Sequence, residues 1–179
     1  MMDCHSTLST ARPAVFFDRD GVLNKDVNYL YKIEDFCWIA GAKEAIKYYN
    51  TKEYYVFVVT NQSGVARGYY NEDDVKKLHD WMQTELAMMG AHIDDFFHCP
   101  HHVEGVVDKY KRDCECRKPA PGLIFQAFKK WSVDKNKSFL IGDKLSDLEA
   151  ANAAGIKGYL FDSSNLFEFI KNISAEGNL

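Results

Sequence analysis

Short apolar runs alternate with longer amphipathic stretches along this chain, and that alternation limits the folds open to it. The run 54–60, YYVFVVT, is continuous and rich in β-branched residues, which is typical of a strand buried on both faces of a parallel sheet. The stretch 72–89 instead places Val75, Leu78 and Met82 on one stripe, which predicts an amphipathic helix. The alternation as a whole predicts an α/β fold: a doubly wound, Rossmann-like parallel sheet with helices on both faces.

Capping and turn residues set the expected boundaries of these elements. Asn71 and Asp74 form an N-cap signal ahead of the long helix. Ser146 and Glu149 form a capping box for a later helix, which Gly155 ends. The expected strands are 15–17, 54–60, 93–99, 138–142 and 158–161, and the expected helices are 42–50, 72–89, 122–131, 146–154 and 166–170.

A chain of 179 residues is long enough for one domain and short for two of ordinary size. We therefore expect a single domain over 1–179, with its core at 12–162, that acts as a monomer. The net charge of -4 provides no basic surface of the kind that follows a nucleic-acid backbone, so we expect no nucleic-acid partner. Residues 1–12 lack the pattern of a secretory signal, and no apolar stretch is long enough to cross a bilayer. We expect a cytoplasmic protein with reduced thiols and no membrane partner.

Four polar clusters lie where expected strands end or where the third expected helix begins. Ligands of an open parallel sheet bind outside the carboxyl ends of its strands, so we expect these clusters to meet at one site. Together they supply carboxylates, hydroxyl and amide donors and a fixed positive charge, which are the parts that a phosphoryl-transfer site requires. Taken singly, each has a simpler explanation as a turn, an N-cap or a surface lysine. The clusters are 18–21 (DRDG), 60–64 (TNQSG), 117–119 (RKP) and 142–144 (GDK).

These motifs resemble those of the haloacid dehalogenase superfamily of phosphatases, over a span from 15 to about 161. Within that superfamily the chain looks like the D,D-heptose 1,7-bisphosphate phosphatase family, of which histidinol phosphatase is a near relative. The shared forms are Asp-Arg-Asp-Gly, Thr-Asn-Gln-Ser-Gly-Val-Ala-Arg-Gly, Cys-Pro-His-His, Cys-Glu-Cys-Arg-Lys-Pro and Gly-Asp-Lys. Too few residues separate Gly21 from Tyr54 for a large inserted cap, so we expect a capless core whose loops select the substrate.

The resemblance assigns catalytic roles to the matching positions. Asp18 resembles the nucleophile that forms an aspartyl-phosphate, and Asp20 resembles the acid that protonates the leaving oxygen and then activates water. One of these carboxyl groups must therefore be ionised and the other protonated. Thr60 and Lys118 resemble the groups that hold the phosphoryl oxygens. Mg²⁺ would be held by Asp18, the backbone carbonyl of Asp20 and Asp143, which offer only oxygen ligands.

The roles of two nearby residues, Asp147 and Val22, follow less directly from the motifs. Asp147 either orients Lys144 or Asp143, or stabilises the first turn of its helix by its charge, and the sequence supports the two roles equally. Val22 stands where many members of the superfamily have threonine. The missing hydroxyl leaves the role of the nucleophile intact and changes how the turn is braced.

Three of the five cysteines crowd beside histidines in one polar loop, 99–116. An odd number of cysteines in a reducing compartment favours metal binding over disulfides. Three thiolates and one imidazole would close a tetrahedral zinc site that anchors the loop and leaves no position for a catalytic water. The alternative is a loop with reduced, metal-free cysteines, and on composition alone His98 and His102 are also candidate ligands. The resemblance assigns Zn²⁺ to Cys99, His101, Cys114 and Cys116.

The resemblance also implies a substrate, D-glycero-D-manno-heptose 1,7-bisphosphate, hydrolysed at C7 in the biosynthesis of nucleotide-activated heptose; the anomer at C1 stays open. Arg117 suits a second phosphate or the oxygens of a sugar, because its planar guanidinium can donate two parallel hydrogen bonds. Tyr69 and Tyr70 either help to bind the sugar or are surface aromatics. The expected substrate-binding residues are Asp26, Val27, Asn28, Tyr29, Asn61, Gln62, Ser63, Arg117 and Lys144.

Three other functions fit parts of the sequence. A histidinol-phosphate phosphatase is the nearest alternative. A non-catalytic, zinc-stabilised interaction module would have no need of the complete catalytic set. A phosphatase acting on nucleic-acid ends would need a basic groove with stacking aromatics, and the sequence clusters neither. The sequence therefore favours a sugar-bisphosphate phosphatase that uses Mg²⁺ and carries Zn²⁺.

Overall fold

The computed structural model describes residues 11–175, so Cys4 lies outside the described part of the chain. Its centre is a five-stranded sheet in the order β3-β2-β1-β4-β5, and every neighbouring pair of strands is parallel. The parallel sheet that the sequence predicts is therefore confirmed. The strands are β1 (Ala14–Phe17), β2 (Tyr55–Asn61), β3 (Asp95–Cys99), β4 (Phe139–Gly142) and β5 (Lys157–Leu160).

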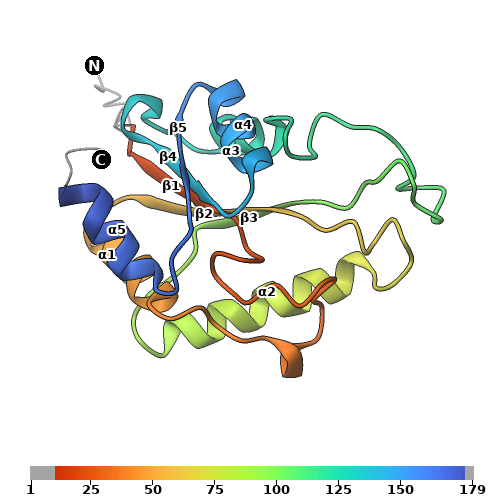
Figure 1. The fold of residues 1–179 in the computed structure, drawn as a ribbon, viewed down its shortest axis with the longest axis horizontal. Helices are drawn as coiled ribbons and strands as arrows, with labels where there is room; N and C mark the ends of the chain where they lie inside the picture. The colour runs from red at the N-terminus through yellow and green to blue at the C-terminus, as the bar shows by residue number, and fades with distance from the viewer. Residues whose placement is uncertain (1–10, 176–179) are drawn as a thin grey trace, which may run out of the picture.

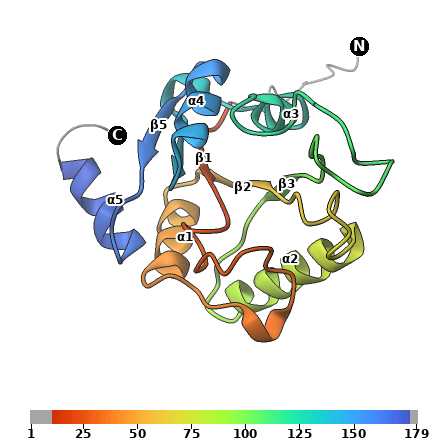
Figure 2. The same cartoon turned by 45° about the vertical axis from the view of Figure 1, so that its right-hand side comes forward.

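Helices cover both faces of this sheet, as a doubly wound fold requires (Figures 1 and 2). Successive residues of β1 point to opposite faces: Val15 and Phe17 pack with α1, α2 and α5, whereas Phe16 packs with α3 and α4. Each face therefore has its own apolar core. The helices are α1 (Ala42–Thr51), α2 (Glu72–Ala87), α3 (Gly122–Lys130), α4 (Leu145–Ala154) and α5 (Leu166–Ala175), and two short 3₁₀ helices, η1 (Ile33–Asp35) and η2 (Lys135–Lys137), lie in the connections.

One predicted cap is confirmed and the other is wrong. The side chain of Asn71 accepts the N–H of Asp74, and the Asp74 carboxylate accepts the N–H of Asn71, so α2 begins with the expected capping box. Helix α4 begins at Leu145, ahead of the predicted cap at Ser146 and Glu149. The reason is that the Asp147 carboxylate accepts the backbone N–H of Lys144 at 3.0 Å, which moves the first turn towards the N-terminus.

Several other boundaries differ from the sequence prediction, most of them by one or two residues. Strand β3 begins at Asp95, not at Ile93, because the side chain of Gln83 bonds both the N–H and the C=O of Ile93 and so takes the place of a strand neighbour. Helix α5 continues to Ala175, past the predicted end at 170. Within the described residues, no helix is long and apolar enough to cross a membrane.

The position of β1 determines where a ligand can bind. From β1 the chain runs to β2 and β3 on one side of the sheet and then crosses to β4 and β5 on the other side, so the strand order reverses at β1. Such a reversal opens a crevice outside the carboxyl ends of the strands. The loops that follow β1, β2 and β4 meet at this crevice.

Candidate active site and metal centre

A cavity of about 530 Å³ lies at the carboxyl ends of β1 and β2 and beside the start of α4. All four predicted catalytic residues line it: Asp18, Asp20, Thr60 and Lys118. Val27 is half exposed and lines a neighbouring hollow formed by residues 27–32 and Asp35. The predicted substrate-binding residues that line the main cavity are Asp26, Asn28, Tyr29, Asn61, Gln62, Ser63, Arg117 and Lys144.

Lys118 is a buried cation that joins two carboxylates. Its Nζ lies 2.9 Å from an oxygen of Asp18 and 2.6 Å from an oxygen of Asp147, and it donates to the carbonyl of Val59. Burial lowers the pKa of Lys118, but the two carboxylates outweigh burial and raise it, so the side chain stays charged. Asp147 therefore does more than either role considered from the sequence: besides bonding the Lys144 backbone, it holds Lys118 against Asp18.

The side chains of Arg19, Asn24 and Gln62 all bind the Asp20 carboxylate. Nη2 of Arg19 lies 3.0 Å from both of its oxygens, Asn24 donates to one oxygen and Gln62 donates to the other. Burial raises the pKa of Asp20, but the charge of Arg19 and the hydrogen bonds from Asn24 and Gln62 outweigh it and hold that pKa below its usual value. Without substrate, the surroundings of Asp20 thus favour the ionised form.

Arg19 contacts a predicted catalytic residue, Asp20, and is a residue of the site that sequence reasoning missed. Its side chain is fully buried, although it stands between two carboxylates in a motif that suggests an exposed turn. Besides Asp20, it binds the carbonyl of Leu30 at 3.0 Å and contacts His79. No local signal separates such an arginine from a solvated one.

Two predicted substrate-binding amides already have protein partners. Asn61 bonds both the N–H and the C=O of Lys118, so it fixes the backbone that carries this lysine. Gln62 donates to Asp20 and Thr60 and accepts from the hydroxyl of Tyr70. Both residues line the cavity, but their side chains are used to hold catalytic groups.

Three carboxylates gather where a cation was expected. Oxygen atoms of Asp18, Asp143 and Asp147 lie within 4.8 Å of one another. Burial raises the pKa of Asp18 to about 7 against the opposing charge of Lys118, and burial also raises the pKa of Asp143. One oxygen of Asp143 is buried without a hydrogen-bond partner. Such a set fits a hard divalent cation, which would offset the cost of burying the carboxylates and bind the orphaned oxygen.

Gly21 allows the Asp143 carboxylate to lie close to the backbone that follows Asp20. A Cβ built on it would lie 2.2 Å from Oδ2 of Asp143, and its φ of +92° is one that side chains with a Cβ rarely adopt. The glycine behind the Asp-x-Asp pair is therefore required by close contact with the third carboxylate.

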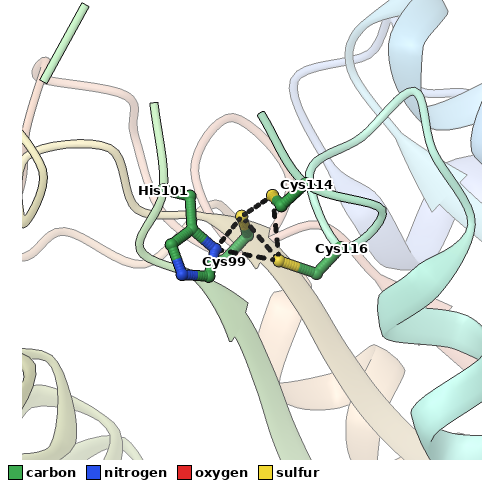
Figure 3. Close-up of side chains that lie close together, drawn as sticks. All are labelled: Cys99, His101, Cys114 and Cys116. Atoms are coloured by element: carbon green, nitrogen blue, oxygen red, sulfur yellow. Dashed lines mark hydrogen bonds between the residues drawn. The ribbon is translucent and has the colours of Figure 1, made fainter. Parts of the chain in front are cut away.

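The four predicted zinc ligands point at one another (Figure 3). Cys99 Sγ lies 3.4 Å from Cys114 Sγ and 3.0 Å from Cys116 Sγ, and Nδ1 of His101 lies 3.3 Å from Cys116 Sγ. Hydrogen bonds from Cys99 and the other cluster members lower the pKa of Cys116 to about 5. A site with three sulfurs and one nitrogen, one thiol of which ionises readily, fits zinc.

The competing histidines lie outside this cluster. Nε2 of His98 faces Glu72 at 3.7 Å, and the ring of His102 contacts Arg67. The structure thus places His101, and neither His98 nor His102, among the cysteines, a choice that composition alone left open. Arg117 follows Cys116 directly and lies over the carbonyl of His101, at 3.5 Å, so the cluster fixes the chain that brings Arg117 to the cavity.

Comparison with known proteins shows the family of this chain. A family model described as HAD-hydrolase-like matches residues 115–165. The D-glycero-β-D-manno-heptose-1,7-bisphosphate 7-phosphatase of Rhodopseudomonas palustris is 52% identical over 165 residues, which is 92% of this chain and 92% of that protein. A D-glycero-α-D-manno-heptose-1,7-bisphosphate 7-phosphatase of Photorhabdus laumondii is 49% identical over 79% of this chain and 77% of its own length.

A solved structure shows the same relationship. The D,D-heptose 1,7-bisphosphate phosphatase of B. bronchiseptica, complexed with magnesium and phosphate, is 34% identical, with a TM-score of 0.74 over 89% of this chain and 86% of that one. The identities, the coverage and the shared fold show that this chain belongs to the D-glycero-D-manno-heptose-1,7-bisphosphate 7-phosphatase family of the haloacid dehalogenase superfamily.

Proposed function

We propose that this chain hydrolyses the phosphate ester at C7 of D-glycero-D-manno-heptose 1,7-bisphosphate and leaves the C1 phosphate in place. Its family membership makes it a phosphoric monoester hydrolase. The observation that carries the substrate proposal is a single cavity that joins Asp18, Asp20 and Lys118 with a further cation, Arg117. One end of such a cavity can perform the chemistry while the other binds a second phosphate.

The reaction divides into two balanced steps. In the first, an oxygen of Asp18 bonds to phosphorus, the bond from phosphorus to the C7 oxygen breaks, and Asp20 gives that oxygen a proton. In the second, water attacks the phosphorus of the aspartyl-phosphate, Asp20 takes a proton from the water, the bond from phosphorus to the Asp18 oxygen breaks, and inorganic phosphate leaves. Thr60 and Lys118 stabilise the phosphoryl oxygens throughout.

The carboxylate cluster supports Mg²⁺ as the cation, held by Asp18, Asp143 and the backbone carbonyl of Asp20. When bound, Mg²⁺ would withdraw charge from the phosphoryl oxygens. Asp147 keeps Lys118 charged and in place, and Lys118 in turn keeps the Asp18 carboxylate pointing into the cavity. The B. bronchiseptica relative, solved with magnesium and phosphate, is consistent with this assignment.

The cluster of Cys99, His101, Cys114 and Cys116 is proposed to hold one Zn²⁺, as an anchor for the loop and for Arg117. A reducing compartment such as the cytoplasm keeps these thiols available for the metal. Each face of the sheet has its own apolar core, so we expect the domain to keep its fold without zinc.

We expect the purified protein to contain about one zinc per chain, and Cys114→Ser to lose it. The variant should keep its secondary structure while kcat/KM for the bisphosphate falls about tenfold or more, because Arg117 loses its anchor. Elemental analysis and steady-state kinetics measure both effects. Cys37→Ser is the matched control, since Cys37 is exposed and lies outside the cluster, and it should keep both zinc and activity. A folded, fully active preparation without zinc would contradict the proposed role.

Arg117→Ala should lower kcat/KM for the 1,7-bisphosphate roughly 10- to 100-fold, the worth of a charge-assisted hydrogen-bond pair. A heptose 7-monophosphate lacks the C1 phosphate that Arg117 binds, so its kcat/KM should change by less than about threefold. Phosphate release from the two substrates, measured side by side, gives the comparison. An equal loss on both would show that Arg117 acts on the catalytic groups and not on the second phosphate.

A further inference from the structure

Tyr70 is a buried aromatic whose hydroxyl reaches the catalytic centre through one intermediate. It lies in the loop between β2 and α2, is 8% exposed, and donates to Oε1 of Gln62 at 2.6 Å. Gln62 is 2% exposed and passes the contact on: its Nε2 donates to Asp20 and to Thr60, both at 2.9 Å. The sequence left open whether Tyr70 is a surface residue, and the structure places it within the cavity wall.

The direction of this chain of hydrogen bonds is fixed at its inner end. The ionised Asp20 carboxylate can only accept, so the amide nitrogen of Gln62 faces it, and Oε1 of Gln62 is left to accept the proton of the Tyr70 hydroxyl. A Cβ on Gly64 would lie 2.1 Å from the Tyr70 ring, which makes the close approach of ring and backbone specific to glycine.

The Tyr70 ring is itself held in place. It stacks on the ring of Tyr31 at 5.1 Å with an interplanar angle of 20°, and packs with Val65 and Val75 in a small apolar cluster. Asp20 is thus held between Arg19 on one side and the pair of Gln62 and Tyr70 on the other.

We propose that Tyr70 is a positioning residue that, through Gln62, holds Asp20 in the orientation in which it gives its proton to the leaving oxygen. This inference rests on the acid and base roles of Asp20 in the proposed function. When the hydroxyl is absent, Oε1 of Gln62 loses its donor, so only the two bonds from Nε2 orient the amide, and the Asp20 carboxyl can turn towards Arg19 and Asn24, which bind it from the other side.

Tyr70→Phe removes the hydroxyl and keeps the ring that packs against Tyr31. We expect kcat for the sugar bisphosphate to fall about tenfold, a part of the effect of losing the acid altogether, with KM within about twofold. Tyr110→Phe is the matched control. Its hydroxyl also makes a short side-chain bond, to Glu72 at 2.7 Å, and its ring packs against the same apolar cluster, but it does not line the cavity. That variant should keep wild-type kinetics.

An activated ester, whose leaving group needs no proton, distinguishes a loss of acid positioning from a general loss of catalytic activity. With enzyme in excess over p-nitrophenyl phosphate, release of nitrophenolate reports only phosphoryl transfer to Asp18, and this leaving group departs without a proton. Tyr70→Phe should release nitrophenolate at the wild-type rate. Equal slowing of both substrates would overturn the inference, as would unchanged kcat on the bisphosphate.

A double variant tests the route through Gln62. In a Gln62→Ala background, or in Gln62→Met should the alanine variant not fold, Tyr70→Phe should change kcat by less than about twofold, because the intermediate is gone. A full additional tenfold loss would show that Tyr70 acts by another path. If the wild type turns over a different sugar phosphate, the proposed substrate fails, and the same ratios measured on that ester still decide the role of Tyr70.

Discussion

Replacing Asp18 with asparagine is expected to lower kcat by at least about a thousandfold, because the amide keeps the shape of the side chain but has no nucleophilic charge. Lys118 keeps its second carboxylate, Asp147, so the fold should survive the change. Phosphate release with saturating substrate measures kcat, and circular dichroism checks the fold. The covalent intermediate should also vanish, which mass spectrometry of acid-quenched protein detects.

A surface carboxylate provides the control for this experiment. Asp162→Asn removes one charge from an exposed residue after β5 and should leave kcat unchanged. Residual activity of Asp18→Asn above about a thousandth of the wild type would falsify covalent catalysis by Asp18.

Asp20→Asn is expected to lower kcat for a sugar phosphate by about 10²- to 10⁴-fold, because both proton transfers pass through this group. The contacts of Asp20 favour its ionised form, which suits the second step. In the first step the bound phosphoryl group brings negative charge into the cavity, and that charge raises the pKa of Asp20 towards the protonated form that an acid needs.

The leaving group distinguishes the two roles of Asp20. With p-nitrophenyl phosphate the first step needs no acid, so Asp20→Asn should still transfer the phosphoryl group and then accumulate aspartyl-phosphate, since no base activates water. A burst of nitrophenolate followed by a slow steady rate would show this. Normal turnover of a sugar phosphate by the variant would assign the acid to another residue.

The architecture was predictable because each strong sequence signal had one structural meaning. The continuous apolar run at 54–60 became the buried strand β2, and the helix after Asn71 begins as its cap requires. Parallel strands also determine where their ends meet, so the convergence of Asp18, Thr60 and Lys118 followed from the fold class. The sequence also predicted that Cys99, His101, Cys114 and Cys116 lie together, and they do, whereas zinc binding by them stays a prediction.

Features that depend on contacts between distant segments were not predictable. The burial of Arg19 becomes clear only when the carbonyl of Leu30 and the carboxylate of Asp20 are both in place to receive its hydrogen bonds. The start of α4 is set by Asp147, a residue whose partner Lys118 comes from another loop. Such pairings leave no periodic pattern in the sequence.

The backbone conformation of the loop after β1 was also not predictable from the sequence. Asn28 and Tyr29 adopt left-handed backbone conformations, with φ of +59° and +54°, in a stretch without glycine. These conformations are sparsely populated by residues with a Cβ and persist where the surroundings impose them. Here the ring of Tyr29 packs edge-on against that of Tyr69, at 4.8 Å, and Lys144 pairs with Asp26. The loop is therefore shaped by neighbours from two other parts of the chain.

Phosphorus NMR of the reaction with 1,7-bisphosphate tests the central proposal most directly, because it shows which ester is cleaved. Relatives of this chain carry the names of either anomer, so the α and β forms at C1 are each supplied in turn. We expect the C7 monoester signal to disappear as inorganic phosphate grows, while the C1 signal persists in the product. Loss of the C1 signal first, or hydrolysis of histidinol phosphate in preference to both anomers, would contradict the account.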